Sequence, residues 1–154
     1  MNDFVFAESD PTRPDVADLL ATHLAFAREV TPPEDVHALD SRGLMEPDVT
    51  LFEARLDEAL VAVGALRHLD ASHVEIKSMH TAVAFRGQGA GRAMLDHLLT
   101  TARARRYGRI SLETGTMPAF DAARALYASH GFDECEPFGQ YQTKANSVCM
   151  TLYL

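Results

Sequence analysis

The sequence predicts a mixed α/β fold of the α+β kind, in which a mostly antiparallel sheet of six to seven strands is flanked by about four helices. Two observations lead to this prediction. Short alternating or fully apolar runs follow one another closely between residues 50 and 83, as in an antiparallel meander. Two longer segments with helical apolar spacing follow, and the first separates two strands as a crossover helix would. With 154 residues the chain is long enough to bury a core, and we expect one domain over residues 1–154.

The first third of the chain is expected to contain one strand and two helices. Residues 4–7 form a short apolar run typical of a strand. Residues 15–30 place their apolar side chains on one helical face. Residues 31–34 have the form of a capping box with proline at the first helical position, which predicts a short second helix to about Leu39. Residues 40–48, which include a glycine and a proline, read as a loop.

The middle of the chain predicts three consecutive strands. Residues 50–56 alternate between apolar and charged side chains, which is typical of a half-buried strand. Residues 59–66 are apolar on both faces and therefore belong in the middle of the sheet. Residues 73–83 form the next strand, and polar turns separate the three. The chain then enters a glycine-rich turn.

The remainder predicts two helices and three more strands. Apolar residues recur at helical spacing after the glycine turn, and this helix ends before Gly108, a good C-terminal cap. Residues 109–114 alternate as a strand, which should run parallel to the strand before the glycine turn because a helix connects the two. Residues 118–130 form another helix. Residues 132–138 and 148–154 are the closing strands.

The glycine-rich turn, Arg86-Gly87-Gln88-Gly89-Ala90-Gly91-Arg92, is the clearest functional feature of the sequence. Glycine permits a close approach of a ligand to the backbone, and the start of the following helix offers unpaired N–H groups and a positive dipole. Such a turn can bind a phosphate or pyrophosphate. No Lys-Ser or Lys-Thr follows, which excludes a P-loop, and Arg92 stands where a dinucleotide fingerprint needs its third glycine.

Residues 86–91 satisfy the pattern Arg/Gln-x-x-Gly-x-Gly/Ala, and this segment resembles the first signature of the GCN5-related N-acetyltransferase (GNAT) superfamily. The resemblance implies that the turn binds the pyrophosphate of acetyl-CoA, with the strands of the sheet splayed at that site. It also implies that main-chain groups of Met79, His80 and Thr81 pair with the pantetheine arm. The cofactor-binding candidates are therefore Met79, His80, Thr81, Arg86, Gly87, Gln88, Gly89, Ala90, Gly91, Arg92 and Phe120. The co-substrate expected is acetyl-CoA, without a metal.

Residues 123–132 resemble the second GNAT signature, Ala-x-x-Leu-Tyr-x-x-x-Gly-Phe. In the family this tyrosine, here Tyr127, lies near the thioester sulfur and is often the general acid. A phenol with a pKa of about 10 can protonate a leaving thiolate. The alternative is a core tyrosine that packs on the sheet. Phe120 stands where the family often has an asparagine that contacts coenzyme A, so a contact there would be apolar, to pantetheine.

Two carboxylates are candidates for the general base that deprotonates the acceptor amine. Glu75 precedes Arg86 by eleven residues, a spacing that resembles the histone-type branch of the superfamily. Glu113 lies on the neighbouring strand, near the point where the two parallel strands would splay, and either accepts the proton or binds the substrate ammonium. An ordinary strand charge is the alternative for Glu75. His80 is a weaker candidate.

The function expected is an N-acetyltransferase that moves the acetyl group from acetyl-CoA to a primary amine of a small molecule or peptide. No cysteine lies in either signature, which favours direct attack without an acyl-enzyme. The rival interpretation is a non-catalytic acyl-CoA binding or sensing module on the same fold. A net charge of −8 opposes binding of nucleic acid and is compatible with a cationic amine. The lack of a signal peptide or membrane-spanning run and the two cysteines favour a cytoplasmic protein, which could be a homodimer.

Overall fold

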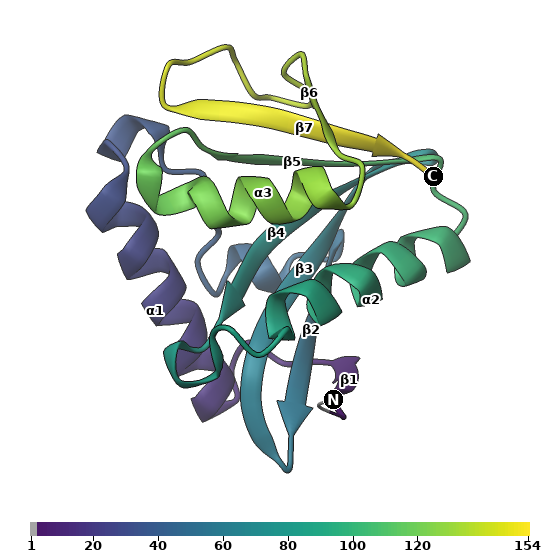
Figure 1. Ribbon diagram of the computed structural model, residues 1–154. Coiled ribbons are helices and arrows are strands. Elements are labelled where there is room, and N and C mark those ends of the chain that lie inside the picture. Colours follow the sequence, from purple (N-terminus) through teal and green to yellow (C-terminus); the bar gives the residue numbers. More distant parts are fainter. Residues whose placement is uncertain (1–2) are drawn as a thin grey trace.

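The computed structural model describes residues 3–154 and confirms the predicted mixed fold (Figure 1). Within these residues, seven strands form one sheet in the order β1-β2-β3-β4-β5-β7-β6. The strands are β1 (Val5–Glu8), β2 (Val49–Leu56), β3 (Ala59–Asp70), β4 (His73–Thr81), β5 (Arg109–Gly115), β6 (Asp133–Cys135) and β7 (Ser147–Tyr153). The α-helices are α1 (Pro14–Val30), α2 (Ala90–Ala104) and α3 (Asp121–Ser129). Short 3-10 turns are η1 (Pro33–Asp35), η2 (Gly43–Met45), η3 (Val83–Phe85) and η4 (Pro118–Phe120).

The central strands β4 and β5 pair in parallel, as the sequence predicted, whereas the other neighbouring strands are antiparallel. The parallel pairing is short: it begins at His73–Arg109 and ends at Glu75–Ser111. Beyond that point β4 and β5 part. On its other side β4 carries a bulge, because its pairing with β3 passes from Lys77 directly to His80 over one intervening β3 residue.

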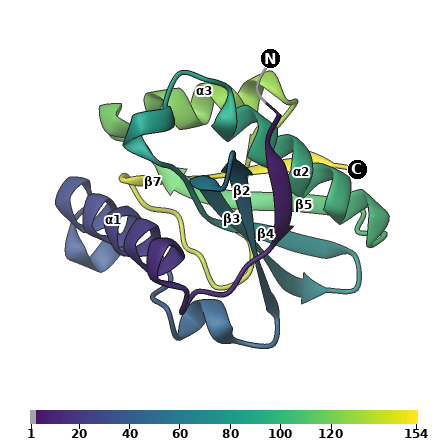
Figure 2. The same ribbon diagram turned by 90° about the horizontal axis from the view of Figure 1, so that it is seen from below.

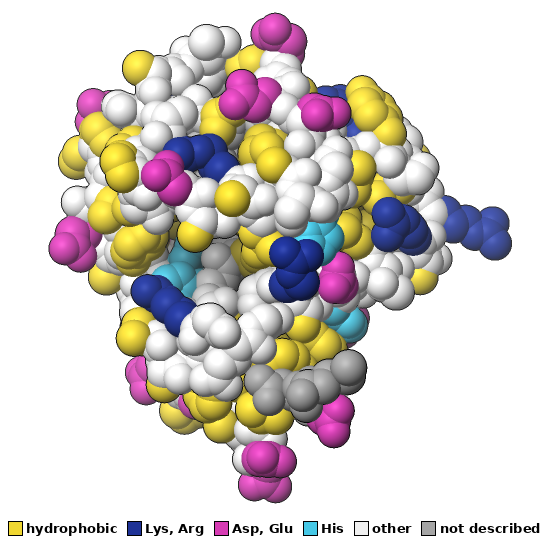
Figure 3. Space-filling model, viewed as in Figure 1, with side chains coloured by type: hydrophobic (Ala, Val, Ile, Leu, Met, Phe, Trp, Pro, Cys, Tyr) yellow, Lys and Arg dark blue, Asp and Glu magenta, His cyan; other side chains and the backbone are white. Residues whose placement is uncertain are grey.

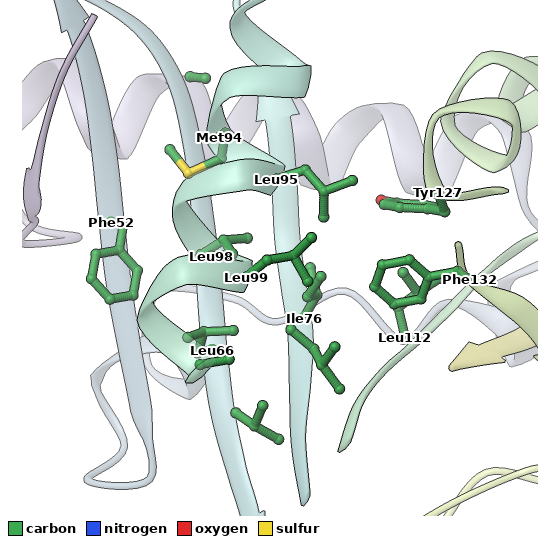
Figure 4. Close-up of a cluster of buried hydrophobic side chains, with 14 of the residues drawn as sticks. Phe52, Leu66, Ile76, Met94, Leu95, Leu98, Leu99, Leu112, Tyr127 and Phe132 are labelled. Atoms are coloured by element: carbon green, nitrogen blue, oxygen red, sulfur yellow. The ribbon is translucent and has the colours of Figure 1, made fainter. Parts of the chain in front are cut away.

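The sheet is covered on both faces. Figure 1 shows α2 and α3 in front of it, and the turned view in Figure 2 shows α1 on the opposite side. Each face has its own apolar core. The core beneath α2 and α3 is shown in Figure 4, where side chains of α2 point onto the sheet; those of Met94, Leu95 and Leu98 are fully buried. The core beneath α1 is built around Val16 and Val63.

Gly64 brings α2 close to the middle of the sheet. A Cβ atom at this position would lie 3.1 Å from the Met94 side chain and 3.2 Å from Leu98. The absence of a side chain on β3 therefore makes room for two of the largest residues on the inner face of α2. Burial of this apolar face, rather than helix propensity, accounts for most of the stability of such a helix.

The structure corrects several predicted boundaries. The helix expected over residues 31–39 is only the 3-10 turn η1, after which Val36 is extended. It stops there because Asp35 pairs with Lys144 and the backbone carbonyl of His37 accepts a hydrogen bond from Lys77, contacts that hold this segment against the sheet. The strand expected over residues 132–138 is reduced to β6, and Phe138 instead packs its ring against His73 and Tyr141.

Two further boundaries differ from those predicted. The strand expected over residues 73–83 ends at Thr81, and residues 83–85 form η3 instead. The helix expected over residues 118–130 begins with η4 and continues as α3. Within residues 3–154 no helix has both the length and the apolar content that a membrane span requires.

Replacement of Leu98 by alanine should lower the free energy of unfolding by about 2–5 kcal/mol, because it leaves a cavity at a fully buried position between α2 and the sheet. Urea denaturation followed by circular dichroism measures this loss. Val5, which is 67% exposed on the edge strand β1, provides the control. Val5→Ala should change stability by no more than about 0.5 kcal/mol. Equal effects of the two substitutions would contradict this description of the core.

Candidate functional site

A cavity of about 680 Å³ lies where β4 and β5 part. Its walls come from α1, the segment after η1, the ends of β4 and β5, the start of α2, and η4 with α3. Figure 3 shows the face of Figure 1 hollowed in this region, with histidine side chains inside and basic side chains near the rim. The cavity thus joins the glycine-rich turn to the carboxylate of Glu113 on β5.

The glycine-rich turn forms one end of the cavity. Gly87 and Gly89 have φ angles of +76° and +85°, a region that side chains disfavour, and a Cβ at either would meet no atom within 4 Å. Gly89 caps α2, whose first helical hydrogen bond runs from the N–H of Ala93 to the Gly89 carbonyl. The N–H groups of residues 90–92 therefore lack acceptors within the helix.

Most of the predicted phosphate-binding residues line this end: Arg86, Gly87, Gly89, Ala90, Gly91 and Arg92. Gln88 is not among the lining residues, and its side chain donates a hydrogen bond of 3.5 Å to the carbonyl of Ala84. The turn combines open backbone N–H groups, the positive end of the α2 dipole and two guanidinium groups. This arrangement can bind a diphosphate.

Met79, His80 and Thr81 also line the cavity. They lie beyond the last β4–β5 pair, so the edge of β4 that faces β5 is open there to another extended chain. An arm that contains amides, such as pantetheine, can pair with this edge as an added strand would.

The imidazole rings of His80 and His23 face each other, with their Nδ1 atoms 3.0 Å apart. One ring must donate this hydrogen bond and the other accept it. Burial lowers the pKa of both histidines to about 4; His80 and Lys77 contribute at His23, and Arg86 contributes at His80. The pair is therefore neutral at neutral pH and has weak basicity.

Phe120 also lines the cavity. Its ring lies directly against Gly115 of β5, where an added Cβ would come within 2.4 Å of it. The ring also packs edge to face with Phe26 of α1, at 5.6 Å between centroids. The lack of a side chain at Gly115 therefore leaves room for the Phe120 ring, which contacts Phe26 of α1.

Tyr127 lies at the boundary between the cavity and the core. It is 7% exposed, and its ring packs edge to face with Phe132. Figure 4 shows the ring beside Phe132, with the hydroxyl directed toward Leu95 of α2. Burial raises the pKa of Tyr127 to about 12, so the phenol remains protonated at neutral pH. Tyr127 is among the cavity-lining residues, and its role as a proton donor stays a prediction.

The structure gives the two candidate glutamates different surroundings. Glu113 lines the cavity, and within residues 3–154 its carboxylate has no hydrogen-bond or ion-pair partner. Burial raises the pKa of Glu113 to about 7, while Lys77 opposes this shift and Glu75 adds to it. A carboxylate with this pKa can accept a proton and release it again near neutral pH.

Glu75 is 2% exposed and is not among the cavity-lining residues. The hydroxyl of Tyr141 donates a 2.5 Å hydrogen bond to its carboxylate, and the Lys77 ammonium lies 3.6 Å away. Lys77 in turn donates to the hydroxyl of Tyr141 and to the backbone carbonyl of His37. Glu75 thus belongs to a closed polar network behind the cavity wall.

Sequence reasoning missed the residues that surround these glutamates. Lys77 and Asp35 both line the cavity, and Tyr141 closes the network from the loop between β6 and β7. Alternation along β4 could have placed Lys77 on the same face as Glu75. No local pattern indicates the contacts of Asp35 or Tyr141, which join segments distant in the chain. Among residues 3–154 there is no group of three or more His, Cys, Asp and Glu side chains placed to hold a metal ion.

Comparison with known proteins agrees with this geometry. A model of the acetyltransferase (GNAT) family matches residues 15–132. An uncharacterised N-acetyltransferase of Bacillus subtilis (strain 168), YsnE, is 42% identical over 142 residues, which are 92% of this chain and 94% of the relative. A second uncharacterised N-acetyltransferase, YedL of Escherichia coli (strain K12), is 40% identical over 151 residues, with 98% and 95% coverage.

The fold also matches solved structures. A GNAT family acetyltransferase from Elizabethkingia anophelis, determined with acetyl-CoA bound, superimposes with a TM-score of 0.74 over the whole of both chains. Its sequence identity is 18%, so this likeness concerns the fold.

Replacement of Gly89 by alanine should weaken the binding of coenzyme A at least about tenfold, equivalent to about 1.4 kcal/mol. The φ angle of +85° disfavours a side chain, so the backbone N–H groups at the start of α2 must move. Isothermal titration calorimetry measures the affinity.

Gly139→Ala is the matched control, because Gly139 also has a positive φ, +57°, with no atom within 4 Å of an added Cβ, but is not among the cavity-lining residues. Both variants should lose about 1 kcal/mol of stability, and only Gly89→Ala should lose affinity. Unchanged binding by a folded Gly89→Ala variant would contradict the assignment of the turn.

Proposed function

This chain belongs to the acetyltransferase (GNAT) family and is an acetyl-CoA-dependent acyltransferase, and on that premise we propose that it acetylates a primary amine by direct attack on the thioester. The acceptor in this proposal is an amine of a small molecule or a peptide. The observation that carries the proposal is the unpartnered carboxylate of Glu113 in the same cavity as Tyr127 and the glycine-rich turn.

Glu113 is the general base in this proposal. An aliphatic amine has a pKa near 10 and arrives as an ammonium ion, so it must lose a proton before its nitrogen can attack. Glu113 faces the cavity without a competing partner, and its pKa of about 7 suits a group that accepts a proton near neutral pH. Glu75 is a poorer candidate because Tyr141 and Lys77 already occupy its carboxylate.

Tyr127 is the general acid. When the amine nitrogen bonds to the acetyl carbon, the carbon–sulfur bond breaks and the sulfur leaves as a thiolate. The buried phenol of Tyr127 is protonated and lies on the cavity wall, so it can supply the proton that the thiolate needs. The nitrogen bonded to the acetyl carbon also loses its second proton, which returns to the Tyr127 phenolate, and Glu113 releases the first proton to solvent. The overall reaction thus converts an ammonium ion and acetyl-CoA into the amide, free coenzyme A and one proton.

The two cysteines support transfer without an acyl-enzyme. Neither Cys135 nor Cys149 is among the cavity-lining residues. Burial raises the pKa of the Cys149 thiol to about 11, so it is protonated and weakly nucleophilic at neutral pH. Direct attack by the amine therefore needs no nucleophile from the protein.

A non-catalytic acyl-CoA sensor would use the same glycine-rich turn but would require neither a free base nor a proton donor. The unpartnered state of Glu113 favours the enzyme, because an isolated half-buried carboxylate destabilises the folded protein and is not needed for binding acyl-CoA. Release of free thiol from acetyl-CoA, measured across a panel of amines, distinguishes the two functions.

Glu113→Gln should lower kcat by about 10²- to 10⁴-fold, the contribution typical of a positioned general base. In the wild-type protein the rate should rise with pH and reach half its maximum near pH 7, because Glu113 accepts a proton only when ionised. The variant should lose this rise. Steady-state kinetics between pH 5 and 9 measure both effects.

Glu75→Gln is the matched control for the same chemical change. Its kcat should fall less, and the rise in rate should persist at a lower pH, because the Glu75 charge contributes to the raised pKa of Glu113. A pH profile that disappears in Glu75→Gln and survives in Glu113→Gln would assign the base to Glu75 instead.

Tyr127→Phe should lower kcat by about 10²-fold or more while the KM for acetyl-CoA changes little, since only the transferable proton is removed. The exposed Tyr153 provides a control, and Tyr153→Phe should leave the kinetics unchanged. If the folded Tyr127→Phe enzyme retains full turnover, another group protonates the thiolate.

A further inference from the structure

We propose that the acceptor is a primary monoamine that carries an aromatic or similarly broad apolar group and has no carboxylate. This inference rests on the proposed function and names its substrate class. Two features of the cavity lead to this inference. One is the balance of charge around Glu113, and the other is the edge-to-face contact between Phe26 and Phe120 in the cavity lining.

The charged side chains around Glu113 form two ion pairs, and the carboxylate of Glu113 itself remains outside them. Asp35, which is 7% exposed, lies 3.0 Å from the ammonium of Lys144 and accepts a further hydrogen bond from Asn146. Glu75 and Lys77 form the second pair. Glu113 has no such partner within residues 3–154.

The neighbouring histidines do not compensate this charge. His23 and His80 are neutral at neutral pH, as described above. Burial and the nearby ammonium groups of Lys77 and Lys144 lower the pKa of His37, although Asp35 and Glu75 oppose that shift. Arg86 and Arg92 lie with the glycine-rich turn, where they face the diphosphate end.

One ammonium group therefore balances the acceptor side of the cavity when Glu113 is ionised. An α-amino acid would bring another carboxylate into the same space, near Glu113, Glu75 and Asp35. Among the described residues, no unpaired cation on this side of the cavity could form an ion pair with that carboxylate. A diamine would bring a second ammonium group close to Lys77, whose partners are already in place. Charges left unpaired in a partly buried site oppose binding strongly.

The apolar part of the acceptor has a defined surface to contact. Phe26 of α1 and Phe120 of η4 both line the cavity and meet edge to face. The neutral ring of His80 lies 6.3 Å from that of Phe26. Small side chains, Ala27 and Ala119, line the cavity beside the two phenylalanines. Aromatic groups prefer such edge-to-face contacts, and a flat apolar group would extend this arrangement.

The experiment compares four acceptors: phenethylamine; phenylalanine, which adds one carboxylate; putrescine, which replaces the ring by a second amine; and propylamine, which lacks the ring. Thiol release gives kcat/KM for each. We expect phenethylamine to exceed phenylalanine and putrescine at least tenfold. Calorimetry with the protein saturated with coenzyme A gives the affinities of the same compounds independently of turnover.

Two substitutions test the two features separately. Asp35→Asn leaves Lys144 without its carboxylate partner and removes one negative charge, so the preference for phenethylamine over phenylalanine should narrow severalfold. Phe26→Ala should narrow the preference for phenethylamine over propylamine severalfold, and Phe26→Leu, which retains more volume, should narrow it less. Tyr153→Ala removes an exposed ring that is not among the cavity-lining residues. It should change neither the phenethylamine-to-phenylalanine ratio nor the phenethylamine-to-propylamine ratio of kcat/KM.

The outcomes separate this inference from the proposed function. Turnover of phenylalanine or putrescine at or above the rate of phenethylamine would overturn the substrate class and leave amine acetylation intact. Binding of coenzyme A without thiol release for any member of the wider amine panel would overturn both. Ratios unchanged by Asp35→Asn and by both Phe26 variants would show that neither the charge balance nor the aromatic contact selects the acceptor.

Discussion

The early end of the parallel pairing between β4 and β5 is the constraint on which the site depends. Only the segment from His73–Arg109 to Glu75–Ser111 is paired, and the strands then diverge. Divergence leaves backbone groups of β4 open and creates a space in the middle of the sheet. A helix start on one side and a set of carboxylates on the other reach this space. A continuous ladder would have closed the route along which the thioester and the amine must meet.

A polar network on the α1 face holds the structure together around this opening. Lys77 and Tyr141 link β4 to the loop before β7, while Asp35 and Lys144 link that loop to the segment after α1. Both pairs join parts of the chain that no regular element connects directly. They also satisfy the carboxylates of Glu75 and Asp35, whereas Glu113 has no hydrogen-bond or ion-pair partner within residues 3–154.

The two ends of the cavity have opposite electrostatic character although the whole chain carries a net charge of −8. At the glycine-rich turn, backbone N–H groups, the helix dipole and two arginines favour an anionic ligand. At the other end an uncompensated carboxylate and neutral histidines favour a cation. The aromatic contact between Phe26 and Phe120 adds an apolar surface across the same cavity. The local arrangement of charge, rather than its total, therefore suits both an anionic co-substrate and the proposed cationic acceptor in one cavity.

The sequence by itself determined the features that depend on neighbours in the chain. Three such features were predicted: the turn at Gly87, Gly89 and Gly91, the apolar face of α2, and the parallel direction of β5. Local backbone preference and apolar periodicity determine them. The tertiary structure alone decided which glutamate is free, since Glu75 is satisfied by Tyr141, 66 residues away in the chain. It also decided that η1 is not a longer helix, because Asp35 is held by Asn146, 111 residues away. Such long-range side-chain contacts follow from how the folded segments meet, and no periodicity in the sequence records them.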